Sequence, residues 1–206
     1  MTTVYLIRHS EPFKVHKGIE ETNESILFSN IKSPLSINGE KLAERISNNE
    51  EFNNIDIVWS SNYVRAMSTA KYFASKNNLK VNVSDQLGER KHGVASWEEL
   101  PSDFETHQWD DENYKVGNGE SQKETRIRIK NKLDKILEEN KGKRILIIGH
   151  STATAFLFGC WCEIKYTGPY KFKNKEFFDG KWNFCETFKL IFDDENNLIS
   201  IENLKL

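Results

Sequence analysis

The fold is decided by a short apolar run that ends in an arginine, a histidine and an acid: Val4-Tyr5-Leu6-Ile7-Arg8-His9-Ser10-Glu11. Such a run predicts a buried strand of a parallel sheet. The guanidinium and the imidazole then lie at the strand's carboxyl end, where open α/β sheets bind their ligands. A second apolar run, residues 144–149, ends in His150 and Ser151. Two histidines at two strand ends predict one shared site.

The composition indicates a folded cytoplasmic protein. The chain has 206 residues, which suits one large α/β domain better than two small ones. Its net charge of -2 gives no electrostatic reason to expect nucleic acid or an anionic membrane as a partner. No apolar stretch approaches the roughly 20 residues that span a bilayer, and the N-terminus lacks the shape of a signal peptide. An odd number of cysteines, three, argues against a disulfide framework.

Strand and helix patterns alternate along the chain. We expect strands near residues 3–8, 55–59, 79–83 and 145–148, and helices near residues 40–48, 63–76, 120–139 and 152–160. Residues 182–192 and 198–204 flank a strong turn and predict an antiparallel hairpin. The sequence therefore predicts a single domain over residues 1–206: a three-layer α/β/α fold with a mainly parallel central sheet and an antiparallel C-terminal hairpin.

Three stretches are harder to interpret. Residues 11–35 predict a long irregular connection, and residues 84–118 predict a lid or insertion that faces the substrate. We expect the residues that choose the substrate in 12–33 and 90–118. The alternating lysines at 171, 173 and 175 indicate a solvated face.

Arg65 lies where helix electrostatics disfavours it. Ser60-Ser61-Asn62 is suitable capping chemistry for the helix that follows. A cation in the first turn of that helix gains nothing from the helix dipole, which favours cations at the other end. We interpret Arg65 as a functional residue.

The set to explain is Arg8, His9, Arg65, Glu89 and His150. Guanidinium groups grip a dianionic phosphate in a fork, and backbone amides of the helix after His150 add dipoles of the right sign. A neutral imidazole in such a pocket can attack phosphorus. A carboxylic acid opposite it can protonate the leaving oxygen.

Five blocks in order resemble the histidine phosphatase superfamily, the phosphoglycerate mutase-like proteins. They are Leu6-Ile7-Arg8-His9-Ser10-Glu11, Pro34-Leu35-Ser36-x-x-Gly39, Ser60-Ser61-x-x-x-Arg65-Ala66-x-x-Thr69-Ala70, Leu87-x-Glu89 with Gly93, and Gly119-Glu120-Ser121, before the apolar run that ends in His150. The resemblance spans the whole chain.

The resemblance implies a role for each residue of the set. His9 is the phosphorylated nucleophile, Arg8, Arg65 and His150 hold the phosphoryl group, and Glu89 is first acid and then base. Glu98, Glu99 and Glu120 are nearby alternatives to Glu89. No metal and no cofactor is implied, because the arginines replace the cation that many phosphoryl-transfer enzymes need.

The chain departs from the family where glycine usually follows each histidine. Ser10 and Ser151 stand at these positions, and each adds a hydroxyl to a pocket where glycine permits close approach. We include Ser151 among the phosphate-binding residues. An asparagine that several members place a few residues beyond the nucleophile has no counterpart here.

Hydrolysis is favoured over transfer between positions of one substrate. Glu89-Arg90-Lys91-His92-Gly93 partly resembles a block of the mutases, but residues 102–118 contain no arginine. Gly93-Val94-Ala95-Ser96-Trp97-Glu98 instead looks like a pattern of the small phosphatases that act on metabolites. We therefore expect a phosphomonoesterase for a small phosphorylated substrate, with Arg90 and Lys91 binding further negative charge. His92 is expected at the surface, and Trp97 and Trp109 in the packing of the lid.

Other interpretations stay open. One is phosphoglycerate mutase-type transfer, and another is a non-catalytic protein that binds phosphate and regulates, for which the two serines argue. A histidine-ligated metallohydrolase is weaker, because no two histidines have ligand spacing on one helix. The oligomeric state is open, with a homodimer among the states considered.

Overall fold

The central sheet has six strands in the order β3-β2-β4-β1-β7-β8. The computed structural model describes residues 1–13 and 27–206. The strands β3, β2, β4 and β1 are parallel, and β7 runs antiparallel to β1 and to β8. Their bounds are β1 Thr2–Arg8, β2 Ile57–Ser61, β3 Val81–Ser84, β4 Arg144–Gly149, β7 Thr187–Phe192 and β8 Leu198–Leu204. The mainly parallel sheet and the antiparallel C-terminal hairpin are confirmed.

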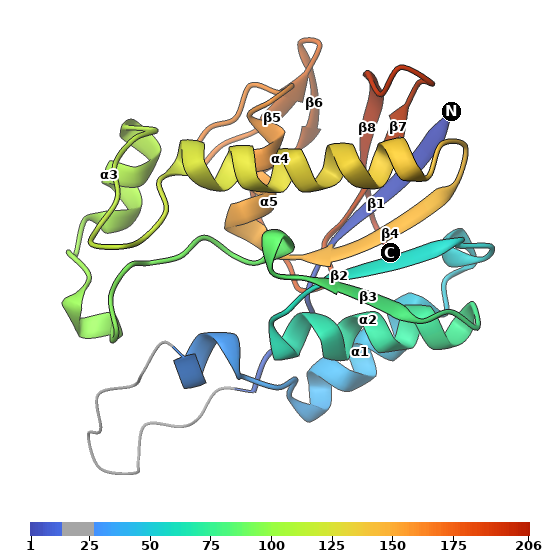
Figure 1. Cartoon of the computed structure of the whole chain (residues 1–206), viewed down its shortest axis with the longest axis horizontal. Helices are drawn as coiled ribbons and strands as arrows, with labels where there is room; N and C mark the ends of the chain where they lie inside the picture. The colour runs from blue at the N-terminus through green and yellow to red at the C-terminus, as the bar shows by residue number, and fades with distance from the viewer. Residues whose placement is uncertain (14–26) are drawn as a thin grey trace.

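Helices cover both faces of this sheet (Figure 1). The helices α1, Ile37–Ser47, and α2, Val64–Lys76, lie on one face, and α4, Gln122–Glu139, and α5, Ser151–Phe158, lie on the other. Alternate residues of β1 divide between the layers: Val4 and Leu6 pack with α4 and α5, and Tyr5 and Ile7 pack toward α2. Both faces of β1 are thus buried, as its unbroken apolar run requires, and the α/β/α arrangement is confirmed.

The starts of two helices are capped differently. A capping box starts α4. The Ser121 side chain accepts from the Glu124 amide, and the Glu124 side chain accepts from the Ser121 amide. Ser60 and Ser61, interpreted as cap residues, belong to β2 instead. The N-cap of α2 is Tyr63, which makes no side-chain capping bond. The serine hydroxyls are therefore available for other contacts.

Residues 84–118 form an excursion beyond the sheet edge. It contains three short helices, η3 Asp85–Leu87, η4 Trp97–Glu99 and α3 Phe104–Asp110, the last of which projects away from the sheet in Figure 1. The outgoing and returning segments of this excursion meet at Gly93. Its φ is +82°, and a Cβ there would lie 1.9 Å from the Val116 carbonyl oxygen. Only glycine fits this crossing. Trp109 then anchors α3 by stacking on Tyr166 at 5.4 Å between ring centroids.

A second antiparallel hairpin was not predicted from the sequence. It pairs β5, Tyr170–Phe172, with β6, Lys175–Phe178, and buries Tyr170 and Phe178. Lys173 and Lys175 are exposed, in agreement with a solvated face, but that interpretation overlooked the hairpin to which they belong.

Part of the irregular stretch 11–35 can be described. Pro12 forms an isolated antiparallel bridge with Leu35, and Leu27–Ile31 form the π-helical turn η1. Residues 14–26, which include much of the segment expected to choose the substrate, lie outside the described part of the chain. Within the described residues, no helix is both long and apolar enough to span a membrane.

Candidate active site

The two strand-end histidines are neighbours. β1 and β4 pair in parallel register, with Arg8 opposite Gly149, so the next residues in each chain segment, His9 and His150, lie side by side. The His9 amide also donates to the Gly149 carbonyl oxygen at 3.0 Å. The ring centroids are 5.2 Å apart. The structure thus brings together the two histidines that the sequence placed at one edge of the sheet.

Arg65 joins both rings. From the first turn of α2, its Nε lies 2.9 Å from His9 Nε2, and its Nη2 lies 3.2 Å from His150 Nδ1. The residue is only 6% exposed, and its guanidinium lies 4.9 Å from the centroid of the Tyr63 ring. Burial lowers the pKa of Arg65 to about 10, against the opposing charge of Glu89, so it remains a cation at pH 7. Its unusual place at a helix start is explained by these contacts.

The hydrogen bonds define one tautomer for each histidine. His9 Nδ1 lies 2.7 Å from the Ser10 carbonyl oxygen, which only accepts, so Nδ1 carries the proton and Nε2 a lone pair. His150 Nδ1 faces the donor Arg65, so its Nε2 carries the proton and donates to Ser61 Oγ at 2.7 Å. Burial first, and then the Arg65 charge, lower the pKa of both rings well below 6.5. Both are neutral at pH 7, and the lone pair of His9 Nε2 faces a guanidinium.

Arg8 completes the cationic side of the site. Its Nη1 donates to the Trp182 carbonyl oxygen at 2.9 Å, and its guanidinium carbon lies 4.6 Å from the centroid of the Phe184 ring. Its buried Nε has no hydrogen-bond partner among the described residues. Burial lowers the pKa of Arg8, and the negative charge of Glu89 opposes that shift most strongly. Glu89 therefore lies close enough to act on both arginines.

Glu89 occupies the start of α5. Its carboxylate accepts from the Ala153 amide at 2.7 Å and from the Thr152 amide at 3.3 Å, and the charge suits the helix dipole. These two amides are among those expected to bind phosphate; here they are bonded to Glu89, and their binding of phosphate stays a prediction. The alternative acid Glu120 is instead bound to Arg128, at 2.6 Å. Ser151, the first residue of α5, is partly buried beside His150.

Serine fits after His9 without a glycine backbone. Neither Ser10 nor Ser151 is among the described residues with positive φ. The Ser10 amide donates to Thr69 Oγ1 at 2.9 Å, and its hydroxyl donates to the Gly39 carbonyl oxygen at 2.7 Å. The hydroxyl is thus held by α1 and is not directed at His9.

The site is closed by a residue that sequence reasoning missed. Asn30, in η1, accepts from Arg65 Nη2 through Oδ1 at 2.7 Å and from Arg65 Nη1 through its carbonyl oxygen. Trp97 of η4 donates through Nε1 to Ser29 Oγ at 2.8 Å, which ties the two turns together. His9 is 5% exposed beneath them. Two oxygens therefore lie on Arg65 where an anion would bind.

The two predicted substrate-binding cations lie in different environments. Arg90 is 3% exposed, is paired with Glu105 and lies over the Phe104 ring at 5.1 Å, but its Nε and Nη1 have no partner among the described residues. Lys91 is exposed, and its amide donates to Glu120 at 3.1 Å. His92, expected at the surface, is instead buried against Trp97 at 4.8 Å. Burial, Arg90 and Arg65 lower its pKa to about 4.

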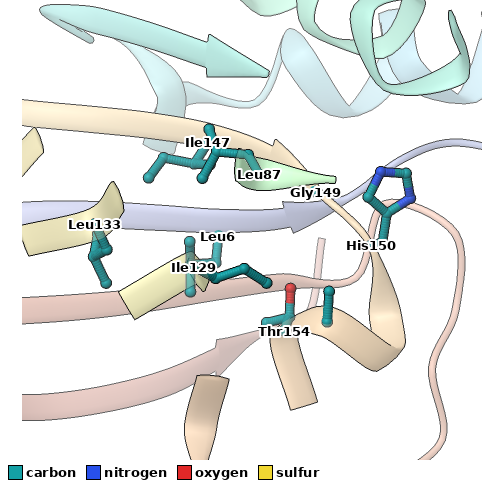
Figure 2. Close-up of a pocket in the computed structure, with 9 residues that line it drawn as sticks. Leu6, Leu87, Ile129, Leu133, Ile147, Gly149, His150 and Thr154 are labelled. Atoms are coloured by element: carbon teal, nitrogen blue, oxygen red, sulfur yellow. The ribbon is translucent and has the colours of Figure 1, made fainter. Parts of the chain in front are cut away.

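Behind His150 lies a cavity of about 20 Å³ (Figure 2). Its walls are side chains of the core between the sheet, α4 and α5, among them Leu6, Ile129, Leu133 and Ile147. That volume suits about one water molecule and is far too small for a metabolite. This cavity is therefore not where a metabolite would bind.

Two further residues belong to the site although no task was predicted for them. Ser61 Oγ is the partner of His150 Nε2, and Tyr63 lies beneath both Arg65 and His150, 4.6 Å from the latter ring. The Ser-Ser-x-x-x-Arg block contained both, but the serines were interpreted as helix caps. Among the described residues, no group of three or more His, Cys, Asp or Glu is arranged to hold a metal ion.

Known proteins are similar to this chain along most of its length. Phosphoserine phosphatase 1 of Hydrogenobacter thermophilus is 27% identical over 161 residues, 73% of this chain and 72% of that protein. The probable phosphoglycerate mutase GpmB of Yersinia enterocolitica is 28% identical over 165 residues, 76% and 73% of the two chains.

Solved structures share the fold at lower identity. A mutant phosphoserine phosphatase from Entamoeba histolytica, in complex with phosphoserine, superposes with a TM-score of 0.66 at 18% identity, over 98% of this chain and 97% of that one. A mycobacterial glucosyl-3-phosphoglycerate phosphatase superposes with a TM-score of 0.69 at 15% identity, over 98% and 95%. Residues 4–177, which carry His9, Arg65, Glu89 and His150, match the sequence model of one family. The chain belongs to the histidine phosphatase superfamily, branch 1.

Proposed function

We propose that this protein hydrolyses the phosphomonoester of a small metabolite through a phosphohistidine at His9. The observation that carries the proposal is the lone pair of His9 Nε2, held by the Ser10 carbonyl bond on Nδ1 and facing Arg65 at 2.9 Å. A buried imidazole that stays neutral is a ready nucleophile at pH 7. The guanidinium that faces it supplies the charge that a phosphoryl group needs.

Binding begins with an exchange on Arg65. The phosphate oxygens replace the two Asn30 oxygens, and the Arg65 Nε turns from His9 to the anion, which frees the lone pair. Arg8 adds its unpartnered Nε, and the site gains the negative charge that its two arginines favour. His150 turns its Nε2–H from Ser61 Oγ to one of the remaining oxygens, and the Ser151 hydroxyl donates to another.

Chemistry then proceeds in two displacements. Glu89 first takes up a proton as the phosphomonoester binds. His9 Nε2 then attacks phosphorus, the ester P–O bond breaks, and its electron pair leaves with the alcohol oxygen, which takes that proton from the Glu89 carboxylic acid. A water molecule next attacks the phosphohistidine and gives a proton to the Glu89 carboxylate, while the P–N bond breaks. His9 returns as a neutral ring and phosphate is released. The arginines neutralise the equatorial oxygens in both steps, so no metal is needed.

The substrate carries a further anionic group beside its phosphate. Arg90 supports this assignment, because its buried Nε and Nη1 have no partner among the described residues, and the exposed Lys91 lies next to it. Phosphoserine, bound by the Entamoeba histolytica relative, is a substrate of this class. Residues 84–118 act as the lid over this part of the substrate.

Mutase activity is the second candidate, and the name of the Yersinia enterocolitica relative favours it. A mutase must hold a second acidic group firmly and keep water from the phosphohistidine. Residues 102–118 contribute no arginine for that purpose, so hydrolysis remains the better assignment. A phosphate-binding protein without turnover is the third.

One assay separates these functions. Wild type and His9→Ala are tested with a generic phosphomonoester and a panel of phosphorylated metabolites, in the presence of a chelator. Turnover that resists the chelator and vanishes in His9→Ala supports the proposal. Loss on chelation points to a metal enzyme, and movement of phosphate within a phosphoglycerate points to a mutase. No turnover with any substrate, together with phosphate binding, points to the regulatory protein.

A further inference from the structure

The turn formed by residues 182–186 encloses Arg8 on three sides. The Trp182 carbonyl oxygen accepts from Arg8 Nη1, the Phe184 ring lies against the guanidinium, and the Glu186 carbonyl oxygen accepts from the Arg8 amide at 2.9 Å. The Cys185 amide also donates to the His9 carbonyl oxygen at 3.4 Å. We call residues 182–186 the Arg8 turn. Its shape decides where the guanidinium of Arg8 lies.

This turn needs something to hold it. Cys185, a residue with a Cβ, has φ of +57°, in the left-handed region that side chains disfavour. A conformation of this kind persists only where surrounding contacts fix it.

The Glu186 carboxylate supplies those contacts. Its side chain is 4% exposed. Oε2 accepts from the amide of Asn183 at 3.1 Å and from its Nδ2 at 2.8 Å, which closes the turn across its own ends. Oε1 accepts from Asn203 Nδ2 at 2.7 Å and lies 3.4 Å from Lys205 Nζ, which fastens the turn to β8 and the chain end.

None of these bonds goes to Arg8 itself. Among the described residues of the site, the Arg8 turn bonds the side chain of Arg8 and, through the Cys185 amide, the main chain of His9, while the carboxylate touches only the turn and its support. Burying a carboxylate costs free energy even when both of its oxygens are hydrogen-bonded. Its use to close this turn indicates that the geometry of the turn matters. Its charge also favours the cationic form of Arg8.

We infer that Glu186 is a positioning residue, which sets the guanidinium of Arg8 for the phosphate through the Arg8 turn. The inference rests on the proposed function, because it takes Arg8 as a phosphate ligand. Removing the charge while keeping the shape of the side chain should let the Trp182 carbonyl and the Phe184 ring shift. Arg8 would then bind phosphate less well, although it is still present.

A double-mutant cycle tests this. Glu186→Gln is made in the wild type and in Arg8→Gln, and the dissociation constant of inorganic phosphate is measured by calorimetry together with kcat/KM for a generic phosphomonoester. We expect Glu186→Gln to weaken phosphate binding about tenfold in the wild type and less than about twofold in Arg8→Gln, because the effect passes through Arg8. Glu202→Gln, the same change at an exposed position of β8, should leave both quantities unchanged.

Equal losses in the two backgrounds, or no loss in the wild type, would overturn the inference. If Glu186→Gln does not fold, Asn203→Ala replaces it, since that variant keeps the carboxylate and removes one of its partners. The phosphate measurement needs no turnover. Wild type that binds phosphate without hydrolysing any ester would therefore overturn the proposed function, while the cycle would still decide the role of Glu186.

Discussion

Ser10 follows the proposed nucleophile directly, where the family usually has glycine. Its backbone does not need glycine, and its hydroxyl is committed to the Gly39 carbonyl oxygen at 2.7 Å. The substitution is therefore compatible with an intact pocket. It also links the nucleophile's segment to α1.

Ser10→Ala should separate stability from activity. Loss of the hydroxyl removes its buried hydrogen bond to the Gly39 carbonyl oxygen, so the free energy of unfolding should fall by about 1 kcal/mol. The kcat/KM should stay within about twofold, since the hydroxyl does not face His9. Urea denaturation and steady-state kinetics measure the two effects, with the exposed Ser200→Ala as the control. A collapse of kcat/KM in a folded Ser10→Ala protein would show that the hydroxyl takes part in the chemistry.

At this scale the sequence predicted the residues that follow strand ends. His9 and His150 were predictable because buried strands of a parallel sheet bring their carboxyl ends together, and Arg65 because its position opposes the helix dipole. Asn30 was not predictable, since it reaches Arg65 from a connection without periodicity. The burial of His92 was missed for the same reason: no pattern in residues 84–118 shows which side chains pack inward.

Among the elements, η1 has the most direct bearing on function. Asn30 places two oxygens on Arg65, and the Trp97–Ser29 bond holds η1 against η4. The phosphate must displace these oxygens, so part of its binding free energy is spent on the exchange. The amides at the start of α5 offer no substitute, because Glu89 holds two of them.

Asn30→Ala should therefore tighten the binding of inorganic phosphate. Removal of the competing amide oxygen leaves Arg65 with one fewer partner to release, which we expect to lower the dissociation constant about fivefold. Calorimetry checks this, with Asn38→Ala at an exposed position of α1 as the matched control. Weaker binding in Asn30→Ala would contradict the exchange and make Asn30 itself a ligand of the phosphate.

Elements were predicted well where one rule acts alone. Apolar periodicity predicted the helix α4, and the capping box of Ser121 and Glu124, which was not predicted, fixes its start. The interpretation of Ser60 and Ser61 as helix caps was wrong. A serine hydroxyl can cap a helix, but it can equally well bond a histidine at the end of a strand. The hairpin β5–β6 was not predicted, because its alternating lysines were interpreted as a solvated face although two of its aromatic residues, Tyr170 and Phe178, are buried.

Three histidines in the described part of the chain are buried in neutral form. Burial is the main cause that lowers the pKa of His9 and His150 well below 6.5 and that of His92 to about 4. Above pH 6.5 these rings are neutral in the folded and the unfolded chain, so they exert no pH dependence there. Below pH 6.5 these histidines bind protons in the unfolded chain but stay neutral in the folded chain.

Stability should consequently fall as the pH is lowered from 7 to 5. The contribution of these rings is fully present above the unfolded pKa of about 6.5 and is lost as the pH falls toward the folded values. Urea midpoints at a series of pH values measure this. In His92→Gln the decline should be shallower, because one of the three rings no longer titrates. A midpoint that stays constant from pH 7 to 5 would contradict the burial of neutral histidines.

The central claim is that phosphate is carried by His9, and trapping the intermediate tests it most directly. Wild type and His9→Gln are mixed with a phosphomonoester, quenched in base within the first turnover, digested and mapped by mass spectrometry. The account predicts phosphate on the peptide that contains His9 in the wild type, and no phosphopeptide in His9→Gln. Turnover without any phosphohistidine, or phosphate on another residue, would contradict it.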